Sequence, residues 1–90
     1  MANASHPSVT IYTTPNCPDC HALKDWLAKE GIAFEERDLS RPAIMAEAKA
    51  RAGVRVAPIS IVGDEVFYGT FPSQKPGLAA RLNLAQSVGK

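Results

Sequence analysis

The chain has 90 residues, of which 46% are hydrophobic and 21% charged, and its formal charge is +1 at pH 7. This length forms one small domain, because a second would need about 50 further residues. Ten Lys and Arg balance nine Asp and Glu without a run of like charge, which argues against nucleic acid or an anionic membrane as a partner. No apolar stretch approaches the roughly 20 residues that span a bilayer, and the polar start lacks the apolar centre of an export signal. We therefore expect a cytoplasmic monomer in which residues 1–7 are disordered and residues 8–87 form the domain.

Hydrophobic periodicity and chain breakers predict the first four elements. Residues 8–13 alternate and are rich in β-branched side chains, which favours a strand. Residues 18–30 carry apolar side chains at helical spacing, with Pro18 suited to the first turn of the helix. A second strand is predicted over 32–39, followed by a helix that Ser40 caps and that runs from Pro42 to Ala52.

The remaining chain predicts a hairpin and a last helix. Residues 59–62 and 65–68 read as strands joined by the tight turn Gly63-Asp64. A helix is expected over about 73–87, with Leu78, Leu82 and Ala85 on one face. The order β-α-β-α-β-β-α predicts an α/β fold, in which the first two strands are parallel and three helices flank a four-stranded mixed sheet.

The two cysteines are the most informative residues, and they stand in the segment Cys17-Pro18-Asp19-Cys20. The segment follows a predicted strand and begins a predicted helix, so Cys20 lies one turn into the helix and both sulfurs can reach bonding distance. The helix start favours a thiolate on Cys17, at the exposed end. This pattern predicts that Cys17 attacks a substrate disulfide and that Cys20 then attacks Cys17 to release the reduced substrate.

Three charged neighbours bear on this chemistry. The negative charge of Asp19 opposes a nearby thiolate, and we expect it to make the dithiol a better reductant. His21 and Lys24 would offset this effect if they turned toward the sulfurs, although a solvated helix face is the simpler interpretation.

Other interpretations of the cysteine pair have less support in the sequence. A zinc site needs four ligands, and besides the two cysteines only His21 and His6 are at hand, so we expect no metal. Two inert buried cysteines are also conceivable. Cys17 to His21 has the Cys-x-x-Cys-His spacing of covalent haem attachment, but the absent export signal and the strand-rich pattern argue against haem. A redox pair that works without a bound cofactor is favoured.

The pattern from Val9 to Cys20, together with Val56-Ala57-Pro58 and the hairpin turn Gly63-Asp64, resembles the glutaredoxin family. This resemblance implies a thioredoxin-like fold and dithiol–disulfide oxidoreductase activity. It implies that the peptide bond before Pro58 is cis and that this proline faces the cysteines. It also implies that the backbone of Ala57 pairs with the bound thiol substrate like an added strand.

Departures from the family pattern indicate the reductant. Glutathione-dependent members usually carry Cys-Pro-Tyr-Cys and a Gly-Gly pair followed by an acidic residue, whereas this chain has Asp19 and Tyr68-Gly69-Thr70-Phe71. The arrangement Phe67-Tyr68-Gly69 is more similar to NrdH-type redoxins, which take electrons from thioredoxin reductase and pass them to ribonucleotide reductase. We therefore expect a protein disulfide as the substrate, with ribonucleotide reductase as one candidate, and thioredoxin reductase rather than glutathione as the reductant.

The same resemblance suggests a set of substrate-binding residues around the catalytic pair: Pro18, Asp19, Ala57, Pro58, Tyr68 and Gly69. Val56, Phe67 and Phe71 are further candidates for an apolar collar around the sulfurs. The alternatives are a glutathione-dependent glutaredoxin, an iron–sulfur module that shares a cluster through Cys17, and an interaction domain without turnover.

Overall fold

The computed structural model describes residues 8–54 and 56–82, which form four strands and three helices. The elements are β1 (Val9–Thr13), α1 (Pro18–Lys29), β2 (Glu35–Asp38), α2 (Pro42–Ala52), β3 (Ile59–Val62), β4 (Glu65–Tyr68) and α3 (Phe71–Leu82). The order predicted from the sequence is confirmed. Within the described ranges no helix is long and apolar enough to cross a membrane. The predictions for residues 1–7 and 83–87 lie outside the described residues.

The four strands form one mixed sheet in the order β2-β1-β3-β4. β1 and β2 are parallel, as the helix between them predicts, while β3 is antiparallel to both β1 and β4. Tyr12 lies opposite Ile59, and Ile59 lies opposite Tyr68. The end of β1, the start of β3 and the end of β4 therefore meet at one end of the sheet.

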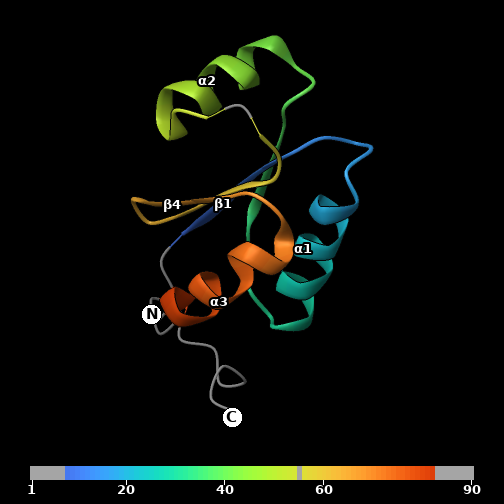
Figure 1. The fold of residues 1–90 in the computed structure, drawn as a ribbon, viewed down its shortest axis with the longest axis vertical. Coiled ribbons are helices and arrows are strands. Elements are labelled where there is room, and N and C mark those ends of the chain that lie inside the picture. The colour runs from blue at the N-terminus through green and yellow to red at the C-terminus, as the bar shows by residue number, and fades with distance from the viewer. Residues whose placement is uncertain (1–7, 55, 83–90) are drawn as a thin grey trace.

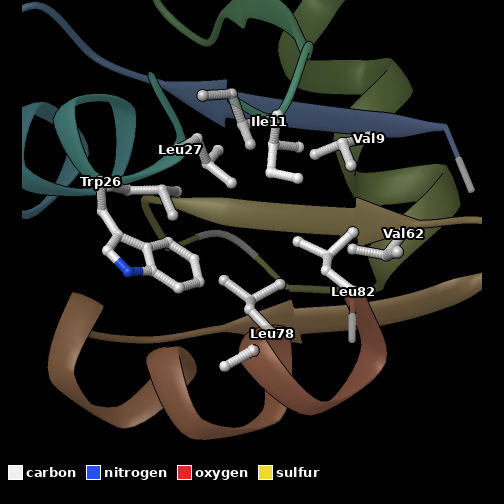
Figure 2. Packing of buried hydrophobic residues seen from close by; sticks show 10 residues of the cluster. Val9, Ile11, Trp26, Leu27, Val62, Leu78 and Leu82 are labelled. Carbon is white, nitrogen blue, oxygen red and sulfur yellow. The ribbon is translucent and has the colours of Figure 1, made fainter. Parts of the chain in front are cut away.

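Helices cover both faces of the sheet, with α1 and α3 on one face and α2 on the other (Figure 1). Successive side chains of a strand point to opposite faces, so Ile11 is buried against α1 and α3 and Tyr12 is buried toward α2. Figure 2 shows the larger cluster, which includes Val9, Ile11, Trp26, Leu27, Val62, Leu78 and Leu82. Each fully buried Leu or Ile contributes about 1.5–3 kcal/mol, so this cluster fixes α1 and α3 on the sheet.

A polar network holds α2 on the opposite face. The Tyr12 hydroxyl donates to Glu47 Oε2 at 2.6 Å, and Arg51 Nη1 donates to the same hydroxyl at 2.8 Å. Arg37 Nη2 of β2 donates to Glu47 Oε1 at 2.9 Å. These charge-assisted hydrogen bonds add to the apolar contacts of Ile44 and Ala48, the two buried side chains of α2, in attaching the helix to the sheet.

Two predictions near β2 are wrong in detail. The strand is Glu35–Asp38 rather than 32–39, because pairing with β1 begins only at Thr10 and Glu35, and Ile32 packs in the larger cluster as a loop residue. Ser40 does not cap α2. The N-cap residue is Arg41, and the Ser40 hydroxyl donates back to the last residue of β2 at 2.7 Å.

The last helix begins at Phe71, two residues earlier than predicted. Thr70 is the reason, because its Oγ1 accepts a hydrogen bond from the Ser73 N–H at 3.3 Å, as an N-cap residue does. Pro72 fits the first turn, where a missing N–H leaves no hydrogen bond unmade. Pro76 consequently lies inside the helix.

Candidate active site

Cys17 lies where β1 passes into α1, and it is the N-cap residue of that helix. The backbone N–H of Cys20 donates to Cys17 Sγ at 3.1 Å. Pro18 is the first helical residue, and its ring suits a position where an N–H would have no partner. The Cys17 sulfur thus accepts one of the N–H groups that a helix leaves unpaired at its start.

The two cysteines differ in exposure, and no disulfide joins them in this structure. Cys17 is half-buried and Cys20 is fully buried. Burial, followed by the hydrogen bond with Cys17, raises the pKa of the Cys20 thiol to about 12, although a backbone hydrogen bond from Thr14 and the charge of Lys24 act in the opposite direction. Cys17 is therefore the more accessible of the two sulfurs, and its surroundings favour the protonated form of Cys20.

Pro58 and Gly69 lie at the same end of the sheet. The Ala57–Pro58 peptide is cis, as the family resemblance implies, and Pro58 is buried. Pro58 directly precedes Ile59, which pairs with Tyr12, so it lies at the end of the sheet from which β1 continues into the Cys17 loop. Gly69 has a φ of 110°, where L side chains rarely lie, and a Cβ there would come within 3.1 Å of Ser73 Oγ.

Gln74 joins Pro58 to Gly69, and our sequence analysis missed it. Its side chain is only 2% exposed. Nε2 donates to the carbonyl oxygens of Pro58 at 2.8 Å and Gly69 at 2.9 Å, while Oε1 accepts from Ser60 Oγ at 2.7 Å. The available signal was its position one turn before Leu78, on the buried row of the helix.

The other predicted binding residues differ in their exposure to solvent. Tyr68 is 54% exposed and Val56 is 43% exposed, so both present apolar surface to solvent. Ala57 and Asp19 are half-buried and Pro18 is exposed. Their contact with substrate stays a prediction. Phe67 and Phe71, in contrast, pack on the larger cluster, so the core accounts for most of their burial.

Two of the three charged neighbours of the cysteines, His21 and Lys24, form hydrogen bonds. The His21 ring is bonded to the Pro15 carbonyl oxygen at 3.2 Å, and Lys24 Nζ donates to Glu36 Oε2 at 2.9 Å. Thr13 Oγ1 donates to the same carboxylate oxygen at 2.6 Å. These residues line an open depression of about 470 Å³ beside the Cys17 loop. His21 and Lys24 are therefore not only solvated, because each also forms a hydrogen bond within the protein.

Comparison with known proteins identifies the family. The glutaredoxin family model matches residues 9–67, which include both cysteines and Pro58. The chain is 35% identical over 71 residues to the glutaredoxin-like protein NrdH of Lactococcus lactis subsp. lactis, a match that covers 79% of the chain and 99% of the relative. The solved structure of the NrdH-redoxin from Escherichia coli has a TM-score of 0.60 at 36% identity and covers 71% of this chain and 83% of that one.

The fold is also shared with a crystal structure of a thioredoxin-like protein. That structure has a TM-score of 0.76 at 26% identity, and the match covers 83% of this chain and all 100% of the other. The predicted topology and the matched segment agree, because residues 9–67 run from β1 into β4. The chain belongs to the glutaredoxin family and is a thiol–disulfide oxidoreductase with a thioredoxin-like fold.

Proposed function

We propose that this oxidoreductase reduces protein disulfides, with Cys17 as the nucleophile and Cys20 as the resolving thiol. The difference between the two sulfurs carries the proposal. Cys17 is half-buried at a helix start, whereas Cys20 is fully buried one turn further along the helix. Only Cys17 is open to a bulky disulfide, and only Cys20 is placed to attack Cys17 afterwards.

The reaction has two thiol–disulfide exchange steps. In the first, Cys17 Sγ bonds to one sulfur of the substrate disulfide, and the other substrate sulfur leaves with the electron pair of the broken bond and takes up a proton from water. In the second, Cys20 loses its proton and bonds to Cys17 Sγ, and the remaining substrate sulfur leaves in the same way. Two electrons pass to the substrate, a Cys17–Cys20 disulfide forms, and no bound cofactor is required.

The surroundings of Cys20 favour this order of steps. Two of the causes that raise its pKa, the hydrogen bond with Cys17 and the charge of Cys17, depend on the free Cys17 sulfur. Both causes end when that sulfur becomes part of a mixed disulfide. The pKa of Cys20 then falls, so the first exchange makes the resolving thiol easier to deprotonate.

We further infer that thioredoxin reductase, rather than glutathione, reduces the Cys17–Cys20 disulfide. Glutathione-dependent members usually carry a basic residue shortly before the first cysteine, whereas Thr14-Pro15-Asn16 holds none. This chain also has Asp19 in place of their tyrosine and Tyr68-Gly69-Thr70 in place of their Gly-Gly pair. The similar proteins are named NrdH, and a thioredoxin-like activity profile is ascribed to the one from Escherichia coli. A monomer in the reducing cytoplasm, with ribonucleotide reductase as a candidate target, fits this assignment.

A metal site built within one chain has less support. In residues 8–54 and 56–82, no group of three or more His, Cys, Asp or Glu side chains comes together as a metal site would require. A cluster shared between two chains through Cys17 would colour the anaerobically purified protein brown, which makes this alternative easy to test.

The proposal is tested by NADPH consumption with insulin as the disulfide substrate. The protein is coupled in one assay to thioredoxin reductase and in another to glutathione with glutathione reductase. We expect turnover with thioredoxin reductase alone, no turnover for Cys17→Ser, and a trapped mixed disulfide for Cys20→Ser. Turnover only with glutathione would replace the proposed reductant, and full activity of Cys17→Ser would contradict the proposed nucleophile.

A further inference from the structure

Gln74 is a buried polar residue whose hydrogen bonds reach beyond its own helix. It projects from α3 with 2% exposure, and its two donated hydrogen bonds reach the carbonyl oxygens of Pro58 and Gly69. Its acceptor takes a hydrogen bond from Ser60, which is fully buried in β3. Both amide hydrogens and the amide oxygen therefore have partners, so the side chain is held in one orientation.

The two carbonyl groups belong to backbone at the end of the sheet where β1 leads into the Cys17 loop. Pro58 follows Ala57 at the start of β3, and Gly69 follows Tyr68 at the end of β4. These strands pair with each other, but the ladder ends at Ile59 and Tyr68, so it does not fix the backbone beyond them. A single nitrogen atom, Gln74 Nε2, binds both oxygens and thereby joins the two segments.

We propose that Gln74 is a positioning residue of the active site, which fixes the Pro58 and Gly69 backbone so that a peptide on either side of a substrate disulfide can dock beside Cys17. This inference rests on the proposed reduction of protein disulfides. Gln74 itself touches neither substrate nor sulfur. Its effect is confined to substrates that contact the backbone near Ala57 and Tyr68, and the intrinsic reactivity of Cys17 does not depend on it.

Substrate size separates this role from a purely structural one. Insulin brings peptide chains to the active site, whereas 5,5′-dithiobis(2-nitrobenzoate) brings only small aromatic groups. Losing a positioning residue slows the reaction with insulin and leaves the reaction with the small disulfide nearly unchanged. Both reactions need Cys17, but only the reaction with insulin needs a well-placed backbone. General destabilisation of the fold lowers both rates together.

Gln74→Met is the main variant, because methionine has a similar length and cannot donate a hydrogen bond. Ser60→Ala is the matched control, because it removes the third hydrogen bond of Gln74 in the same buried layer and leaves both bonds to the carbonyl groups. Each protein is reduced and freed of reductant. Its second-order rate constant is then measured with insulin and with the small disulfide, alongside its circular dichroism spectrum and thermal midpoint.

We expect Gln74→Met to react about tenfold more slowly with insulin, equivalent to about 1.4 kcal/mol, and within twofold of the parent protein with the small disulfide. Ser60→Ala should keep the parent ratio of the two rate constants within twofold. An unchanged ratio in Gln74→Met, or an equal fall in both rates, would overturn the proposal.

A second variant covers the case in which Gln74→Met does not fold. Gln74→Asn keeps the amide but is one methylene shorter, so it cannot hold both carbonyl groups, and we expect its ratio to fall in the same direction by at least threefold. An unchanged ratio in folded Gln74→Asn also contradicts the inference. If the parent protein itself fails to reduce insulin, the proposed function fails instead, and the small-disulfide rate shows that the dithiol was still reactive.

Discussion

The burial of Cys20 predicts how the second exchange step depends on pH. Reduced protein mixed with 5,5′-dithiobis(2-nitrobenzoate) should release one coloured thiolate when Cys17 attacks and a second when Cys20 attacks Cys17. Stopped-flow absorbance separates these two phases. Because a thiol must lose its proton before it attacks, the rate of the second phase follows the fraction of Cys20 that is ionised.

The size of the effect follows from the pKa of Cys20. A rise from 9.0 to about 12 lowers its ionised fraction about a thousandfold, so roughly one free dithiol in 10⁵ carries a Cys20 thiolate at pH 7. In the mixed disulfide the contributions of Cys17 are gone, but burial, the largest cause, remains. We therefore expect the second phase to accelerate about tenfold per pH unit from pH 6 to pH 9 without levelling off.

Variants at two positions complete the test. Cys20→Ser should release one thiolate per protein and show no second phase. Lys24→Met should slow the second phase about two- to threefold, because the Lys24 charge lowers the pKa of Cys20 but is partly exposed and paired with Glu36. Lys29→Met, in the last turn of the same helix, is the control and should change nothing. A plateau below pH 8, or a faster second phase in Lys24→Met, would refute the reasoning.

Three further predictions concern stability, each measured by urea denaturation at equilibrium. Gly77→Ala should lower the free energy of unfolding by about 1–2 kcal/mol despite the better helix propensity of alanine, because its Cβ would lie 2.8 Å from Phe67 Cε2; a gain would show that the ring moves freely. Tyr12→Phe should cost about 1 kcal/mol through the loss of its hydroxyl, with the thiol kinetics unchanged. Hydrogen bonds from Tyr12 and Arg37 hold the pKa of Glu47 below its ordinary value, so its contribution to stability is present above the ordinary glutamate pKa and is lost as pH falls through the lowered pKa. Glu47→Gln should flatten this part of the curve, and an unchanged slope would contradict the assignment.

Most of the fold can be predicted from local sequence signals such as turn residues and helix-start residues. Pro18 at a helix start and the tight turn Gly63-Asp64 act within a few residues, and the predicted elements beside them agree with the structure. The position of Cys17 was predictable for the same reason, because a strand end and a helix start meet there. The predicted helix cap is wrong where two local signals compete. The Ser40 hydroxyl donates a hydrogen bond to Asp38 instead of capping the next helix.

Gln74 shows what local signals cannot supply. Its partners Ser60 and Pro58 stand 14 and 16 residues earlier in the chain, so the hydrogen bonds exist only after α3 has packed on the sheet. If the helix began at Ser73, as the sequence predicts, Gln74 would lie in its first turn. Because the helix begins at Phe71, Gln74 lies one turn into it, among the buried residues. The correct start depends on Thr70, which binds the Ser73 N–H.

The two faces of the sheet carry separate polar networks, and this separation makes their roles testable one at a time. Tyr12 is only five residues before Cys17, yet its side chain points to the α2 face, where it binds Glu47 and Arg51. Gln74 lies on the opposite face and binds the backbone of Pro58 and Gly69. Because alternation along β1 and β3 keeps these networks apart, Tyr12→Phe should change stability without substrate selectivity, and Gln74→Met should change selectivity beyond any loss of stability. An equal change in both variants of the ratio between the insulin and small-disulfide rate constants would mean that the sheet transmits strain between its faces. The effect of Gln74 could then not be distinguished from general packing.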